Sequence, residues 1–186
     1  MRLQFALLVV ALACAAACEL AGLAKYRSAR VASATAHDVA FNFTGFWYEQ
    51  AYSDPAQLAS SCQTLNATLL PTGVVNTDFS VRYGAIPFTI TEIYTPSADQ
   101  TAGLYTKTVN EPGGQFVKLN TVLVEAERDD HVIIYSCLGP INEIVIATRE
   151  RYPDVAVVDR LLARASSLGI PVAAGSVSKP SWKKCP

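Results

Sequence analysis

The stretch 42–51 reads Asn-Phe-Thr-Gly-Phe-Trp-Tyr-Glu-Gln-Ala, and far downstream the apolar segment Ile144–Thr148 runs directly into Arg149. Gly45 and Trp47 open the first strand that we predict, whereas Arg149 closes the last strand before a predicted helix. The chain between these points is a succession of apolar and β-branched stretches separated by turn residues. Such a succession is typical of an antiparallel barrel or sandwich.

Eight strands are predicted in this part of the chain, and one helix follows them. The strands are expected at 45–53, 62–70, 74–83, 86–95, 102–109, 115–125, 131–138 and 142–149. Eight antiparallel strands that close on themselves leave an interior that side chains fill or that holds one small ligand. At about 153–168 the apolar period becomes helical, with Pro153 in the first turn and Gly169 beyond the end. The predicted fold class is therefore all-β, an eight-stranded antiparallel up-and-down β-barrel with one C-terminal α-helix packed outside.

The composition is that of a single domain with a balanced charge. The chain has 186 residues, of which 51% are hydrophobic and 17% are charged, and its formal net charge is -1. This apolar content is sufficient for a buried core and is too high for a disordered chain. A net charge near zero creates no attraction for nucleic acid or for an anionic membrane surface. We therefore expect no nucleic acid as a partner.

The N-terminus has the pattern of a secretory signal peptide. Arg2 precedes an apolar run, and the small residues Ala15–Ala17 match a cleavage site. The run is shorter than the roughly 20 residues that a membrane-spanning helix needs, so no integral membrane span is expected. The predicted divisions are a signal peptide at 1–17, an N-terminal arm at 18–44 and the barrel domain at 45–186. A retained anchor or lipid attachment at Cys18 is the alternative for the leader. The arm could be a short helix, a flexible segment or a processed piece.

The cysteines agree with export. Cleavage after Ala17 removes Cys14 and leaves an even number of cysteines, Cys18, Cys62, Cys137 and Cys185. None of them forms a Cys-x-x-Cys pair, and the chain has only two histidines, so disulfides are favoured over a zinc site. Four cysteines permit three pairings, and the residues alone do not choose among them. Asn42 and Asn66 begin acceptor triplets for N-glycosylation, which are compatible with the secretory route.

The Gly-x-Trp that begins at Gly45 and the Arg149 that closes the last strand resemble the signature of the lipocalin family. In that signature, which here comprises Gly45, Trp47 and Arg149, the guanidinium lies on the indole face and closes the barrel floor. A cation–π contact of this kind contributes roughly 0.5 to 2 kcal/mol. The likeness is strongest to the subgroup of apolipoprotein D, insect bilin-binding proteins and crustacyanins. The fragments that carry it are Tyr48-Glu49, Asp54–Leu58 with Cys62, Ile134–Cys137, and Leu168–Ile170 with Cys185. The resemblance implies a disulfide Cys62–Cys185 and a second one, Cys18–Cys137, provided that cleavage leaves Cys18 in the chain.

Strand alternation assigns the two faces of the barrel wall if Cys137 faces outward and Arg149 reaches the indole. The candidate ligand-binding residues of the inward parity are Glu49, Ala51, Phe88, Ile90, Tyr94, Val117, Leu119, Ser136, Leu138, Glu143 and Val145. Glu143, and Glu92 on the parity of Phe88, would need a polar partner or water, because an unpaired buried carboxylate is costly. Alternatively, the apolar members only fill a core, and both carboxylates lie at the wet mouth.

The resemblance implies a secreted, extracellular carrier that binds a small hydrophobic molecule in the barrel, such as a fatty acid, sterol, retinoid, carotenoid or bilin. No cofactor is required, although a bilin, carotenoid or retinoid would be carried as a bound molecule. The competing hypothesis is a secreted non-carrier, an inhibitor or adhesion type of protein that uses the loops at the barrel mouth and has a filled interior. A second copy of the chain and a cell-surface receptor are left open as further partners.

The sequence offers little for catalysis. His131 stands beside Asp129 and Asp130 in a predicted turn, and His37 lies in the N-terminal arm. Neither histidine forms a credible nucleophile–base pair with a serine or cysteine. No Gly-rich phosphate loop and no Gly-x-Ser-x-Gly motif is present. We therefore expect neither an enzyme nor a metal site.

Overall fold

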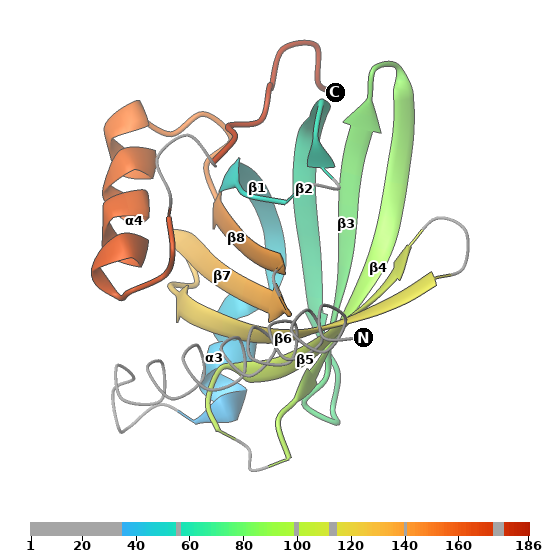
Figure 1. Cartoon of the computed structure of the whole chain (residues 1–186), viewed down its shortest axis with the longest axis vertical. Coiled ribbons are helices and arrows are strands. Elements are labelled where there is room, and N and C mark those ends of the chain that lie inside the picture. The colour runs from blue at the N-terminus through green and yellow to red at the C-terminus, as the bar shows by residue number, and fades with distance from the viewer. Residues whose placement is uncertain (1–34, 55–56, 99–100, 112–114, 140, 173–176) are drawn as a thin grey trace, which may run out of the picture.

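The chain folds into a closed barrel of eight antiparallel strands. The computed structural model describes residues 35–54, 57–98, 101–111, 115–139, 141–172 and 177–186. The strands are β1 (Gly45–Tyr52), β2 (Ser60–Leu69), β3 (Val75–Tyr83), β4 (Ile86–Pro96), β5 (Leu104–Glu111), β6 (Gln115–Ala126), β7 (His131–Leu138) and β8 (Ile141–Thr148). Each strand pairs with the next along the chain, and β8 pairs with β1 to close the barrel (Figure 1). The predicted fold class is confirmed, and every strand end lies within two residues of its predicted position.

The strands show the alternation that a barrel wall requires. On β3, Val75, Thr77, Phe79 and Val81 are buried, whereas Asp78 between them is exposed. The apolar side chains on the inward face join an inner core cluster with residues from the other strands. Because successive side chains of a strand point to opposite faces, one face of each strand can fill the interior while the other meets solvent or a helix.

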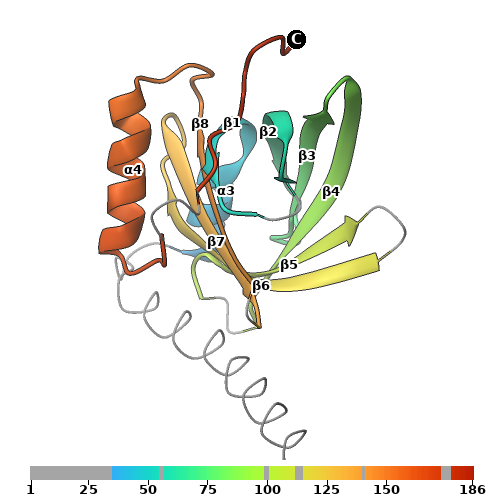
Figure 2. The same ribbon diagram turned by 45° about the horizontal axis from the view of Figure 1, so that its top comes forward.

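Helix α4 (Val155–Ser167) packs on the outside of the barrel, as predicted. Asp154 caps its first turn by accepting a hydrogen bond from the backbone N–H of Ala156. At its end, the N–H of Gly169 donates to the carbonyl of Ser166 and the N–H of Ile170 donates to that of Ala165, which is the Schellman pattern. The buried face of α4 joins an outer core cluster with apolar side chains from β7 and β8. Figure 2 shows the helix lying along the outer wall beside these two strands.

Helix α3 (Ala36–Phe43) resolves part of the N-terminal arm that the sequence left open. Thr35 and Asp38 form a reciprocal capping box at its start. Its buried residues, Ala40 and Phe43, join the inner core cluster, so the helix covers one end of the barrel. The predicted signal peptide at 1–17 and Cys18 lie outside the described residues.

The C-terminal tail returns to the first two strands. The backbone of Ser178 exchanges hydrogen bonds with Tyr52 of β1. Further along, the N–H of Cys62 donates to the carbonyl of Ser181, and a disulfide joins Cys62 to Cys185. The tail is therefore tied to the barrel wall at several points. In the described part of the chain, no helix has both the length and the apolar character needed to cross a membrane.

Candidate functional site

Arg149 and Trp47 meet at the barrel end that α3 covers. The guanidinium carbon of Arg149 lies 3.3 Å from the centre of the Trp47 ring, so the expected stack is present. The indole is fully buried, and its N–H donates a 2.7 Å hydrogen bond to the carbonyl of Phe43 in α3. Gly45 has a φ of +95°, and a Cβ there would lie 2.9 Å from Nη1 of Arg149. The Gly-x-Trp motif therefore leaves room for the arginine that covers the tryptophan.

The same guanidinium joins two segments of backbone through three carbonyl groups. Its Nη1 donates to the carbonyl of Phe46 at 2.7 Å, and its Nη2 donates to the carbonyl of Thr44 at 2.6 Å. Its Nε donates to the carbonyl of Arg128, in the turn between β6 and β7, at 2.6 Å. A planar guanidinium can make these contacts at once because its donors have a fixed fork geometry. Arg149 thus closes this end of the barrel with both stacking and hydrogen bonds.

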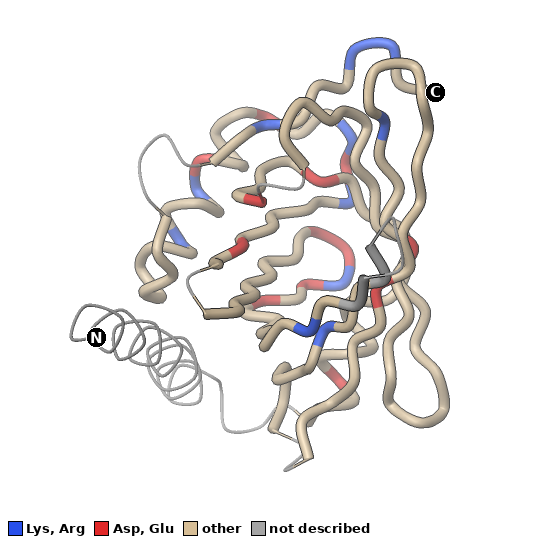
Figure 3. Tube along the Cα trace, turned by 45° about the vertical axis from the view of Figure 1, so that its right-hand side comes forward, with Lys and Arg blue, Asp and Glu red and all other residues tan. Residues whose placement is uncertain are grey.

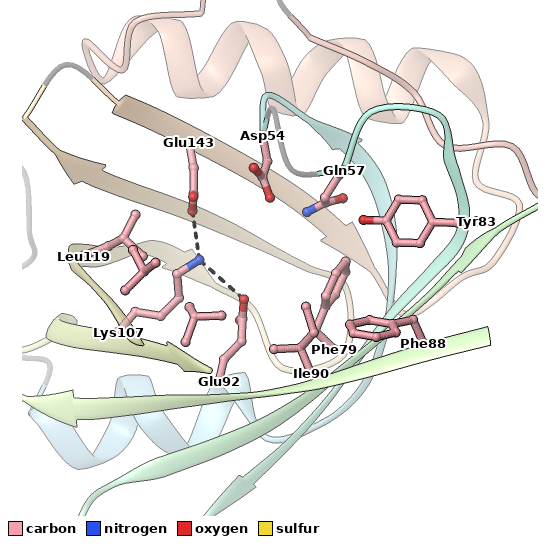
Figure 4. A pocket seen from close by; sticks show the side chains of 12 residues that line it. Asp54, Gln57, Phe79, Tyr83, Phe88, Ile90, Glu92, Lys107, Leu119 and Glu143 are labelled. Atoms are coloured by element: carbon pink, nitrogen blue, oxygen red, sulfur yellow. Dashed lines mark hydrogen bonds and ion pairs between the residues drawn. The ribbon is translucent and has the colours of Figure 1, made fainter. Parts of the chain in front are cut away.

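A cavity of about 330 Å³ lies in the other half of the barrel. Its apolar lining comes from β3, β4, β5 and β6, through Phe79, Phe88, Ile90, Val109, Val117 and Leu119. Its polar lining comes from Glu92, Lys107, Glu143 and Tyr83, and from Asp54 and Gln57 in the segment between β1 and β2. Figure 4 shows these side chains converging on one space inside the wall. The arrangement of apolar walls with a few convergent polar groups is typical of a small-molecule site.

An ion pair crosses the interior at this cavity. The ammonium of Lys107 on β5 lies 2.8 Å from Glu143 on β8 and 3.5 Å from Glu92 on β4, as the dashed lines in Figure 4 show. The other carboxyl oxygen of Glu92 accepts a 2.7 Å hydrogen bond from the hydroxyl of Tyr94. Lys107 keeps only 7% of its side-chain surface exposed. Both carboxylates thus have the polar partner that their buried positions require.

The buried groups have shifted pKa values. Burial by itself would lower the pKa of Lys107, but the charges of Glu92 and Glu143 outweigh it and raise that pKa well above its usual value. Lys107 is therefore an ammonium at neutral pH. Burial, followed by the nearby charge of Glu92, raises the pKa of the Tyr94 hydroxyl well above its usual value, so this hydroxyl stays a donor.

Glu49 is a buried carboxyl with no ion-pair partner among the residues that the structure describes. It is fully buried on β1, and no hydrogen bond reaches either of its carboxyl oxygens from the described residues. Burial is the main reason that its pKa is raised well above the usual value, and the charges of Glu92 and Asp54 add to this effect. The charge of Lys107 opposes the shift without cancelling it. The side chain is therefore protonated well above the pH at which an exposed carboxyl ionises.

The predicted ligand contacts divide into those on the cavity wall and those packed elsewhere. Phe88, Ile90, Val117, Leu119 and Glu143 line the cavity. Four others point into the barrel but do not line the cavity: Glu49, Tyr94, Ser136 and Val145. Tyr94 packs against the ring of Phe43, and the hydroxyl of Ser136 lies 2.9 Å from that of Thr121. A contact between any of these residues and a ligand stays a prediction.

The inward position predicted for Ala51 is wrong. The register of β1 against β8 shifts between Glu49 and Ala51, where a bulge places the extra residue Gln50. One extra residue reverses the faces of those that follow, so Ala51 belongs to the outer core cluster with α4. Leu138, the last residue of β7, keeps the parity of Ser136, but 42% of its surface is exposed and it does not line the cavity, so its contact with a ligand stays a prediction.

Sequence reasoning missed several residues of the lining. Lys107 and Val109 share the inward parity of β5 with the buried Tyr105, a signal that was present but was not used. Phe79 had the same signal on β3. Asp54 and Gln57 carried none, because strand alternation does not extend into the segment between β1 and β2.

Of the predictions for cysteines and asparagines, one is confirmed and the others stay predictions. The disulfide Cys62–Cys185 is present, with 5.6 Å between the Cα atoms. Cys137 is disulfide-bonded and packs in the outer core cluster. The proposed partner Cys18 lies outside the described residues, so that pairing stays a prediction. Asn66 is exposed on β2, and Asn42 is partly buried in α3. Glycosylation at either asparagine also stays a prediction.

His131 takes part in a network of contacts on the wall of the barrel. Its Nδ1 lies 2.9 Å from Asp130, and its Nε2 lies 3.4 Å from Glu125. The other oxygen of Glu125 accepts a 2.6 Å hydrogen bond from Arg164 of α4. This network joins the β6–β7 hairpin to the outer helix. The described residues contain no group of three side chains placed to ligate a metal ion.

Acidic and basic residues are both scattered along the trace in the view of Figure 3. A second concavity, of about 320 Å³, lies outside the barrel between the C-terminal tail and the strands β1 to β4. It is bordered by Tyr48, Arg82, Arg151 and Trp182 among others. The internal cavity is the better candidate site because its apolar walls can surround a ligand.

Comparisons with known proteins show the fold. No protein-family model matches the chain, and no curated protein matches it in sequence. Apocrustacyanin C1 is similar in structure, with a TM-score of 0.61 and 16% identity over 78% of this chain and 81% of that chain. Lobster apocrustacyanin A1 has a TM-score of 0.61 and 16% identity, over 75% of this chain and 77% of that chain. Insecticyanin from the tobacco hornworm Manduca sexta has a TM-score of 0.62 and 16% identity, over 77% of this chain and 80% of that chain. The closed barrel with its C-terminal helix is therefore a lipocalin fold.

Proposed function

We propose that this chain is a secreted carrier that binds a small hydrophobic molecule in the barrel cavity. The observation that carries the proposal is the cavity of about 330 Å³ in a barrel whose other half is filled by the inner core cluster. Each Å² of apolar surface that a ligand and these walls remove from water contributes about 25 cal/mol. A barrel whose only role was to present its loops would have no need of this space.

The cavity size restricts the ligand. Ligand sites in proteins usually enclose about 300 to 1,000 Å³, so this cavity lies at the small end of that range. A compact molecule or a single alkyl chain fits it better than a long polyene, which would have to extend through the mouth. Among the classes implied by the resemblance, we therefore favour a single-chain lipid or a small ring compound over an enclosed carotenoid.

Secretion is the second part of the proposal. The disulfide Cys62–Cys185 supports an oxidising compartment, because such bonds are rare in proteins of the reducing cytosol. The leader at 1–17 has the pattern of a signal peptide. A mass measurement of the mature protein from culture medium tests this part directly. A mature chain that begins after residue 17 is expected, and an intact leader in a cell-retained protein would contradict the proposal.

Binding in the cavity can be tested with a pair of matched variants on one strand. Ile90 lines the cavity, whereas Ile93 on the same strand faces outward and is 39% exposed. Ile90→Trp should fill the cavity, and Ile93→Trp adds the same bulk outside it. The neutral fluorescent probe N-phenyl-1-naphthylamine should bind the wild type and Ile93→Trp with one site each, and Ile90→Trp at least about tenfold more weakly. Equal binding by all three proteins, or none by the wild type, would contradict the proposal.

A further inference from the structure

Among the described residues that line the cavity, acidic side chains outnumber basic ones. Asp54, Glu92 and Glu143 contribute carboxylates, and Lys107 contributes the single cationic group among the described residues that line it. With these groups ionised, the lining carries two more negative charges than positive ones. Glu49, buried inside the barrel on β1, adds a further carboxyl, and burial together with the charges of Glu92 and Asp54 raises its pKa. Among the described residues of the lining, the two carboxylates Glu92 and Glu143 share one lysine.

Lys107 is already engaged by the protein. Its ammonium lies within 3.5 Å of Glu92 and 2.8 Å of Glu143, so an anionic ligand would have to compete with two carboxylates for it. Such a ligand would also approach Asp54 on the same lining. Placing like charges together in a desolvated site is strongly unfavourable. A fatty-acid carboxylate is thus poorly suited to the polar part of the cavity.

Glu143 has acceptor capacity left. Lys107 contacts one of its oxygens, and no hydrogen bond from the described residues reaches the other. Only 14% of the Glu143 side-chain surface is exposed, so a donor entering the cavity would meet it in a partly dry environment. Figure 4 shows Glu143 and Asp54 pointing into the cavity from one side, with Phe88 and Ile90 on the opposite side. An ammonium on the first side would leave its apolar body against the second.

From this geometry we infer that the cavity selects amphiphilic cations, in which an apolar body carries an alkylammonium group that binds beside Glu143. This inference rests on the proposed carrier function and specifies the chemical class of its ligand. The apolar body supplies affinity through burial, and the acidic lining supplies the choice of head group. Charge-assisted hydrogen bonds from the ammonium to a carboxylate are stronger than those between neutral groups.

Three ligands that differ only in the head group test the inference. Decylamine, decanol and decanoate are titrated at about pH 7, where the amine is charged like a lysine side chain and the acid is ionised. Each is measured by displacement of N-phenyl-1-naphthylamine from the full-length secreted protein. We expect the amine to bind most tightly, the alcohol next, and the carboxylate at least about tenfold more weakly than the amine. Decanol or decanoate binding as tightly as decylamine would overturn the inference and leave the carrier function standing.

A matched pair of charge-neutralising variants locates the effect. Glu143→Gln removes a carboxylate from the lining, and Asp78→Asn removes one from the outer face of β3. The ratio of amine to carboxylate affinity should fall about threefold or more in Glu143→Gln and stay unchanged in Asp78→Asn. An equal change in both variants would show a general field effect and overturn the assignment to Glu143. If neither the probe nor any of the three ligands binds the wild type, the carrier function itself fails, and the inference fails with it.

Discussion

Lys107 and Glu143 form an ion pair of 2.8 Å across the barrel interior, between strands β5 and β8, which are not neighbours in the sheet. Together with Glu92 they make a polar bridge inside a wall that is otherwise mainly apolar. The bridge brings charge to the cavity and links distant strands. The same contact therefore bears on both the stability of the barrel and the choice of ligand.

Removing only the lysine should destabilise the barrel. Lys107→Met leaves Glu92 and Glu143 buried without their counter-ion, and breaking a buried pair costs about 3 to 5 kcal/mol of unfolding free energy. The triple variant Lys107→Met, Glu92→Met, Glu143→Met removes the charges together and should lose less than the single variant. Urea unfolding of both variants checks this order. A single variant as stable as the wild type would show that the pair does not hold the strands.

The guanidinium of Arg149 should not be replaceable by another cation. Arg149→Lys keeps the charge but loses the fork that serves Thr44, Phe46 and Arg128, so we expect a loss of about 1 to 3 kcal/mol. Arg160→Lys on the exposed face of α4 is the matched control, with an expected change of about 0.5 kcal/mol or less. Denaturant unfolding compares the two. The same effect from both substitutions would refute a closing role for Arg149.

The buried carboxyl of Glu49 should make the free energy of unfolding fall as the pH rises. Its pKa is raised in the folded chain, mainly by burial, from a usual value of 4.5. Above pH 4.5 the unfolded chain releases this proton while the folded chain keeps it, so the folded state loses relative stability until the pH passes the raised value. Because the side-chain amide in the variant Glu49→Gln cannot ionise, the variant should become more stable relative to the wild type as the pH rises.

This difference is measured by urea unfolding of the wild type and Glu49→Gln at about pH 4, 6 and 8. The difference in unfolding free energy between the two proteins should be smallest at the lowest pH and largest at the highest pH. The opposite trend, with the wild type gaining on the variant as the pH rises, would indicate a carboxylate that is ionised and stabilised in the folded chain.

The disulfide of the tail should contribute much of the stability. Cys62 and Cys185 are 123 residues apart, and in the chain-entropy model a loop of this size contributes about 4 to 5 kcal/mol. The double variant Cys62→Ser, Cys185→Ser should lose this amount in denaturant unfolding without a reductant. A loss of less than about 1 kcal/mol would mean that the backbone contacts at Ser178 and Ser181 hold the tail without the disulfide.

The sequence predicts the positions of the strands well, but it predicts the faces of the strands and the contacts across the barrel less well. Alternation and turn residues located the strands, because the period of two is a direct property of extended backbone. Alternation failed at Ala51, since a bulge at Gln50 reverses the faces and leaves no clear mark in the sequence. The Arg149 stack was available only through the family resemblance, because no local pattern relates it to Trp47.

The polar part of the candidate site was predicted only in part. Glu92 and Glu143 were recognised as carboxylates that need a partner, but Lys107 was not identified as that partner. The pairing joins strands that are separated in the sheet, and sequence spacing does not contain the distance across a barrel. Asp54 and Gln57 reach the cavity from a segment without strand periodicity, so only coordinates could place them.

Native mass spectrometry of the secreted protein measures directly whether the barrel holds one small hydrophobic molecule. The protein is purified from its natural source without detergent and compared with material stripped by organic solvent and refilled with decylamine or decanol. We expect one bound small molecule per chain in the native sample and stoichiometric refilling after stripping. A chain that carries no ligand and takes up none in the wild-type form would contradict this expectation.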